Sequence, residues 1–132
     1  MKRLTKIIIE EKPFKSLRYN TIGDWYRDKN GVLHIEVAAG HSNGAKAVLA
    51  VAIHEMIEVL KCEEHGVTDA VVTAWDKKHQ KDDEPGEIPG APYFTEHAAA
   101  NRVEHAAVEA LDMGSFDQYN QEWADIWDRE VK

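Results

Sequence analysis

Three residues whose types suit metal or acid–base chemistry stand close together in the middle of the chain, at His54, Glu55 and Glu58. His54 and Glu58 are four residues apart, so on a helix their side chains share one face. An imidazole and a carboxylate placed in this way can hold a metal ion, and Glu55 beside them can accept a proton. A separate apolar stripe follows Leu49, Ile53, Met56, Ile57 and Leu60. An amphipathic helix with its polar face in water is therefore the alternative.

The residues that precede His54 favour a covered polar face. One and two turns earlier, the same side of the helix carries Val51, Ala50 and Ala47, which are small apolar residues suited to close packing. If a neighbouring element covers that side, His54 and Glu58 are covered as well, and buried polar groups need partners. The sequence therefore predicts that this polar face looks into a site.

A second pair of polar residues, His97 and Glu104, lies in a helix predicted further along the chain. Both are in line with Asn101, Val108 and Leu111, at spacings of three and four that place all five along one side. The C-terminal part of this line, Val108 and Leu111, is apolar. His97 and Glu104 therefore occupy positions where the pattern predicts apolar side chains. Such departures are common at functional sites. The alternative is that the two residues are buried and satisfy one another or the backbone.

Together the two helices supply two imidazoles and up to two carboxylates for one metal ion, from His54, Glu58, His97 and Glu104. Two histidines and one glutamate around an open position form a known catalytic zinc arrangement. A second glutamate ligand would favour iron or manganese. Glu55 is then the candidate to accept a proton from a water molecule beside the metal. If Glu104 is not a ligand, it could orient His97 or share with Glu55 the role of proton acceptor.

The elements that must position these residues begin with a sheet. Residues 4–39 predict three antiparallel strands, since a β-branched run is followed by a second run at 17–26 and by apolar alternation over 33–37. Asn30 and Gly31 between the last two strands predict a hairpin turn.

Four helices are predicted after the sheet, in a single α+β domain. Their predicted ranges are 43–65, 68–80, 95–113 and 115–130. The expected N-terminal caps are Ser42 or Asn43, then Thr68, Thr95 and Ser115. The fourth helix has an aromatic stripe typical of core or of a subunit interface. Residues 81–94 are rich in proline and glycine, and such a long segment is either functional or a plain connector.

Several other titratable residues are assigned structural roles. His34 falls on the polar side of its strand and is expected to be solvated rather than a ligand, and His105 is expected to be exposed. Asp76 and His79 are expected to form a charge pair at a helix end, with a supporting role at the site as the alternative. Cys62 is expected to be an inert thiol.

Composition limits the classes of function. The chain has 132 residues, 43% of them hydrophobic, which predicts a folded globule. Its formal net charge of −8 argues against nucleic-acid or acidic-membrane partners, although an inhibitor that mimics DNA would carry such a charge. The single cysteine excludes an internal disulfide and fits a reducing compartment. No signal peptide or membrane-spanning run is evident, so a cytoplasmic protein is expected.

Five short motifs resemble a family of short uncharacterised proteins from bacteria and tailed phages. These motifs are His-Glu-Met-Ile-Glu at 54–58, Glu-Pro-Gly at 84–86, Ala-Pro-Tyr at 91–93, Glu-His at 96–97, and Glu104. The likeness covers about the C-terminal two thirds of the chain and implies a metal site. The 54–58 stretch also resembles the zincin signature His-Glu-x-x-His, in which two histidines bind zinc and the glutamate activates water. Here Glu58 stands at the place of the second histidine.

The leading hypothesis is a small zincin-like hydrolase with its metal between the first and third helices. In it His54, Glu58 and His97 hold zinc and Glu55 activates water, with a peptide or small molecule as substrate. The alternative is a non-enzymatic accessory or inhibitor protein of phage type, whose acidic surface binds a host partner and whose metal, if any, is structural. An open position beside Glu55 favours the first hypothesis, and a saturated site or an acidic patch elsewhere favours the second.

Overall fold

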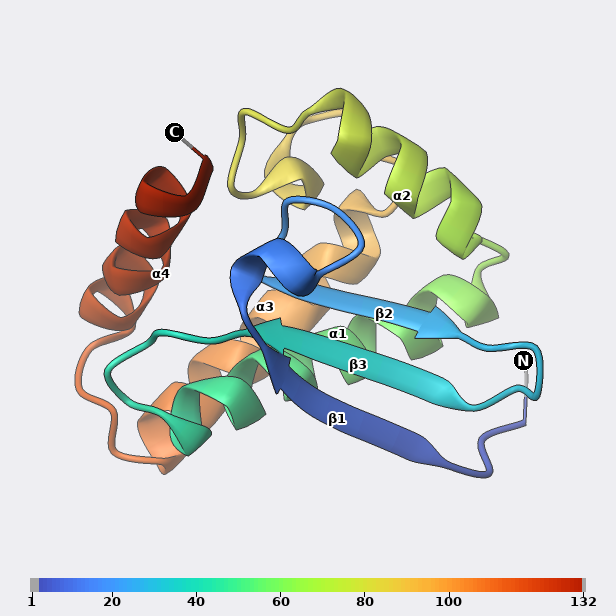
Figure 1. The fold of residues 1–132 in the computed structure, drawn as a ribbon. Coiled ribbons are helices and arrows are strands. Elements are labelled where there is room, and N and C mark those ends of the chain that lie inside the picture. The colour runs from blue at the N-terminus through green and yellow to red at the C-terminus, as the bar shows by residue number, and fades with distance from the viewer. Residues whose placement is uncertain (1–2, 132) are drawn as a thin grey trace.

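The computed structural model describes residues 3–131 and has the α+β fold that the sequence predicts (Figure 1). Within this range the strands are β1 (Ile7–Lys12), β2 (Gly23–Arg27) and β3 (Leu33–Ala38). The α-helices follow the strands and are α1 (Ala45–Glu64), α2 (Asp69–Lys78), α3 (Phe94–Ala110) and α4 (Phe116–Val131). Two short 3-10 helices are η1 (Phe14–Ser16) and η2 (Pro85–Glu87). No helix in residues 3–131 combines the length and apolar character needed to cross a membrane.

The sheet is mixed, so the prediction of an all-antiparallel sheet is wrong at its first strand. The strand order is β1-β3-β2, with β2 antiparallel and β1 parallel to β3. Between β1 and β2 the chain makes no tight turn, because Phe14 and Leu17 of the connection are buried in the core. The connection therefore carries β2 to the far side of β3, and β1 and β3 run in the same direction.

The hairpin between β2 and β3 is confirmed. Its loop places only Gly31 at a positive φ, of 80°. The Asp28 carboxylate accepts the backbone N–H groups of Asn30 and Val32, at 2.8 and 3.1 Å, and so holds the turn. Asp28 also lies 2.8 Å from His34 Nε2, so His34 is partly covered by this loop and stands away from the candidate site.

Helix α1 lies between the sheet and α3, and it buries the side that carries its polar residues (Figure 1). Ala47, Ala50 and Val51 are buried, as the prediction of a covered face requires. The apolar stripe is on the less buried side, and Leu49 in it is 46% exposed. Because small side chains let the sheet and α3 approach closely, the polar side of α1 becomes interior.

The predicted helix caps are confirmed for α2 and α4 and are wrong for α1 and α3. Thr68 accepts the N–H of Val71, and Ser115 accepts that of Gln118. Helix α1 instead begins after Gly44, at φ 57°, because the Ser42 side chain is bonded to Glu122 on α4. Helix α3 already begins at Phe94, so Thr95 lies inside its first turn.

Candidate metal centre

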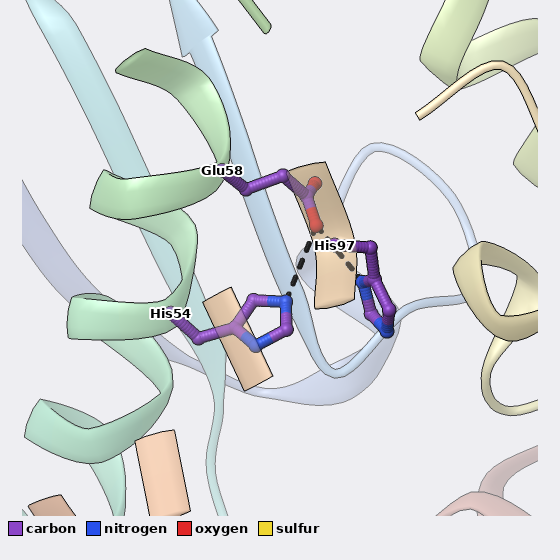
Figure 2. A group of neighbouring side chains, drawn as sticks. All are labelled: His54, Glu58 and His97. Carbon is purple, nitrogen blue, oxygen red and sulfur yellow. Dashed lines mark hydrogen bonds and ion pairs between the residues drawn. The ribbon is translucent and has the colours of Figure 1, made fainter. Parts of the chain in front are cut away.

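Helices α1 and α3 bring His54, Glu58 and His97 together in the interior (Figure 2). His54 Nε2 lies 3.2 Å and His97 Nδ1 lies 3.0 Å from the same oxygen of Glu58, Oε2. All three residues are only 4–6% exposed. The predicted meeting of the two polar groups across α1 and α3 is therefore present in the structure.

The spacing of these three side chains suits a metal ion. One nitrogen or oxygen from each residue lies within 4.8 Å of the other two. Around tetrahedral zinc, ligand atoms about 2.1 Å from the metal stand about 3.4 Å from one another. The separations of 3.0 and 3.2 Å therefore differ from zinc geometry by a few tenths of an ångström, which side-chain rotation can supply.

Each imidazole has a carboxylate at its other nitrogen. Glu104 Oε1 lies 2.9 Å from His54 Nδ1, and Glu84 Oε2 lies 3.3 Å from His97 Nε2. Neither contact has the angle of a directed hydrogen bond, so both buried nitrogens lack a full partner. Histidines that hold metals commonly have a carboxylate at the second nitrogen, which orients the ring.

The position of Glu104 differs from the expectation that it is a metal ligand or a partner of His97. Glu104 is not among the three converging residues, and it contacts His54 rather than His97. Tyr119 on α4 donates to its other oxygen at 2.7 Å and fixes the carboxylate. The residue beside His97 is instead Glu84, which the sequence reasoning missed. Its one signal was the Glu-Pro-Gly motif in the long irregular segment.

The electrostatics of the centre follow from two imidazoles sharing one buried carboxylate. Burial opposes ionisation of Glu58, but its bonds with His54 and His97 outweigh burial and hold its pKa well below the ordinary range. Burial likewise opposes the charge on His97, yet contacts with Glu58 and Glu84 raise its pKa to about 10. In the same way, Glu104 and Glu58 outweigh burial and raise the pKa of His54. A metal ion must therefore displace protons from both rings.

Glu55 faces a cavity beside this centre and is the one buried carboxylate of α1 that has no hydrogen bond among the described residues. It is 6% exposed, and its Oε2 lies 3.6 Å from His54 Nε2. Burial, followed by the charge of Glu58, raises its pKa well above the ordinary value. A buried carboxylate of this kind is suited to accept a proton from a bound molecule.

The cavity has a volume of about 80 Å³, enough for a few water molecules or part of a small ligand. Strand β2, helices α1 to α4 and residues 83–86 all contribute to its wall. The segment 81–94 is therefore part of the site rather than a plain connector, because η2 brings Glu84 and Gly86 against His97.

Two glycines make room for the site. A Cβ on Gly86 would lie 2.6 Å from His97 Cγ and 2.7 Å from its Nδ1, so the backbone of η2 rests directly on the imidazole. A Cβ on Gly23 would lie 2.7 Å from Val51 and 3.1 Å from the carboxyl carbon of Glu55. These close approaches position His97 and Glu55 independently.

Asp76 also belongs to the cavity, and the prediction that it pairs with His79 is wrong. Its carboxylate accepts from Tyr19 at 2.7 Å and from Tyr93, whereas His79 Nδ1 contacts the Trp75 carbonyl. Burial raises the pKa of Asp76 to about 6. No local sequence pattern links Tyr19 or Tyr93 to Asp76, so periodicity alone does not find this network.

The remaining expectations for single residues are met. His105 is exposed and stacks on Phe116, with ring centroids 3.3 Å apart. Cys62 is fully buried, and burial raises the pKa of its thiol, as expected of an inert cysteine.

Comparison with known proteins gives no match. Family models, curated protein sequences and solved structures were each searched, and none matches this chain. The resemblance to bacterial and phage proteins therefore stays a prediction, and the site is interpreted from its own geometry.

The two glycines give a matched pair of variants. Gly86→Ala should lower zinc affinity by about 10- to 100-fold, because the new methyl group displaces the His97 ring. Gly23→Ala should leave zinc affinity unchanged, because it displaces Glu55 and not the converging atoms. Isothermal titration with zinc checks both variants, and thermal unfolding checks that their overpacking costs are similar, at about 1–3 kcal/mol. Equal zinc affinities in the two variants would contradict the assignment of His97.

Asp76 should make stability depend on pH in a particular direction. Its pKa is about 6 in the folded protein and about 3.9 when unfolded, so the folded state binds the proton more tightly. Its contribution to stability is greatest below about pH 4 and falls by up to about 3 kcal/mol as the pH rises past 6. Asp76→Asn lacks this titration, so the wild type should lose stability relative to the variant over that range. Urea unfolding at several pH values measures this difference, and a constant difference would refute it.

Proposed function

We propose that this protein is a small zinc-dependent hydrolase. The observation that carries the proposal is the convergence of His54 Nε2, His97 Nδ1 and a Glu58 oxygen beside a cavity that Glu55 also faces. Two histidines, one glutamate and an open side are the elements of a catalytic zinc site.

A metal explains this cluster better than a purely structural ion triad does. Burying charged groups costs several kcal/mol each, and apolar residues of similar size would stabilise the interior at least as well. Both rings are also backed by carboxylates at the nitrogen that faces away from Glu58, as metal-binding histidines usually are. The donor set therefore fits a cation at the point where the three side chains meet.

Zinc is the metal that this donor set favours. Glu104 lies at the outer nitrogen of His54, so the second carboxylate ligand that would favour iron or manganese is not among the converging atoms. Zinc bound here would polarise a substrate carbonyl and lower the pKa of a nearby water.

Residues of the chain would accept the proton and orient the metal ligands. Glu55 accepts the proton of the attacking water, since it lines the cavity, lies 3.6 Å from His54 Nε2 and has no hydrogen bond within residues 3–131. Glu104 and Glu84 hold the His54 and His97 rings in place. Trp25 donates to Glu58 Oε1 at 3.0 Å, which leaves Oε2 directed at the two imidazoles.

The alternative of a non-enzymatic acidic binding protein has less support. Within residues 3–131 Glu55 has no hydrogen-bond partner and lines a cavity, and this arrangement supports an enzyme with an open position beside Glu55. A cytoplasmic location belongs to the same proposal, and it rests on the single, buried cysteine.

Metal content tests the centre itself. Protein purified without chelator should contain about one zinc ion per chain, and His54→Ala and His97→Ala should each lose most of it, because each removes one of three ligands. His105→Ala is the matched control, since it removes an exposed histidine of α3 away from the site. Elemental analysis by mass spectrometry measures the metal. Equal content in all four proteins would leave the centre without support.

Catalysis is tested separately through Glu55. Glu55→Gln keeps the size of the side chain but removes the proton acceptor, so zinc should be retained while hydrolysis falls about 10²- to 10⁴-fold. A panel of fluorogenic peptide and ester substrates provides the activity measurement. A zinc-loaded Glu55→Gln protein with wild-type activity would exclude Glu55 as the base.

A further inference from the structure

The cavity beside the metal centre is strongly acidic. Eight carboxylate side chains and no lysine or arginine are among its lining residues. These carboxylates are Asp24, Glu55, Glu58, Asp69, Asp76, Asp83, Glu84 and Glu104. Arg18 reaches only Asp24 and Asp69, at 2.7 and 3.0 Å. A divalent metal at the centre would neutralise Glu58, which is one of its ligands. Most of the remaining carboxylates would still lack a cation.

Asp76 is the clearest of these uncompensated groups. It is 7% exposed and makes no ion pair within the part of the chain that the structure describes. Two tyrosine hydroxyls hold its carboxylate at a fixed position, and the rings of Tyr19 and Tyr93 join Val72 in the cavity wall. A carboxylate between aromatic walls is a suitable receptor for an organic cation.

Asp76 lies one tyrosine away from the metal centre. The Tyr93 ring centroid is 5.9 Å from that of His97, and the Tyr93 hydroxyl donates to Asp76. One ligand could therefore reach both the metal centre and Asp76 through the same cavity.

A second observation also points to a ligand in this space. Glu55 is buried, lines the same cavity and has no hydrogen bond among residues 3–131, and its Oε2 lies 3.6 Å from His54 Nε2. A carboxylate that faces a cavity and has no partner among these residues can accept hydrogen bonds from a molecule inside the cavity.

We propose that the Asp76 end of the cavity is a recognition subsite for a positively charged substrate group, an ammonium or a guanidinium. The inference rests on the proposed function, because the reacting carbonyl is placed at His54, Glu58 and His97. The substrates are then amides or esters that carry a basic side chain or a free amine on the side of the bond nearer Asp76. The acidic lining also attracts such cations and repels anionic substrates.

A pair of hydroxamates that differ in one charge tests the subsite. Hexanoyl hydroxamate and aminohexanoyl hydroxamate carry the same metal-binding group, and only the second has a terminal ammonium. Isothermal titration of the zinc-loaded protein should show the amine binding about tenfold or more tightly. Shorter amines of the same series locate the best distance to Asp76.

Variants identify the group responsible. Asp76→Asn keeps the shape of the side chain, so the neutral hydroxamate should bind as before while the preference for the amine falls to nearly none. Asp117→Asn is the matched control, because it removes the same charge from an exposed position on α4 and should preserve the preference. If Asp76→Asn does not fold, the dependence of the wild-type preference on the chain length of the amine tests for a charge at a fixed distance from the metal, which the acidic lining as a whole would not produce.

The outcomes separate the two proposals. Equal binding of both hydroxamates to the wild type, in every chain length, overturns the cationic subsite and leaves the zinc centre intact. A preference that survives Asp76→Asn also overturns the subsite. Failure of zinc and of both hydroxamates to bind overturns the proposed function, and the subsite with it.

Discussion

The structure depends on one buried interaction, the sharing of a single Glu58 oxygen by two imidazoles from different helices. A lone carboxylate in the interior would be expensive, as would a lone imidazolium, so each ionised group requires the others. This requirement fixes α1 against α3 at the level of His54 and His97. The close approach is possible because Ala50 and Ala100, one from each helix, are completely buried.

The surrounding elements restrain the same three residues from other directions. Trp25 connects the sheet to Glu58, Tyr119 connects α4 to Glu104, and Glu84 closes the site from the long segment before α3. Each contact joins residues that are far apart in the chain. The side chains are therefore positioned by the whole fold, which is what a site with small tolerance in distance requires.

The sequence could predict the centre because helical periodicity is local. His54 and Glu58 share a face through their spacing of four, and His97 stands out as a polar residue in an apolar line. The partners of these residues could not be found in this way. Glu84 lies in an irregular segment that has neither helical nor strand periodicity. The direction of β1 depends on a connection whose burial of Phe14 is a tertiary effect.

The choice between the two faces of α1 shows a similar limit of helical periodicity. The sequence shows two candidate faces, and periodicity alone does not tell which one is covered, because α1 is enclosed on two sides by the sheet and α3. Leu49 is on the exposed side although it is strongly apolar. The small residues Ala47 and Val51 were the better guide, since close packing depends on size as well as on polarity.

The cluster and the cavity hold several buried carboxylates, so a bound cation would change the free energy of this interior. Burial, and after it the repulsion from Glu58, raises the pKa values of Glu55 and Asp76. A cation that binds only the folded chain relieves both effects, and mass action then adds its binding free energy to the stability of the fold. Binding and folding are therefore coupled through the same buried charges. The buried carboxylates that raise the free energy of the interior are also the groups that a bound cation would contact.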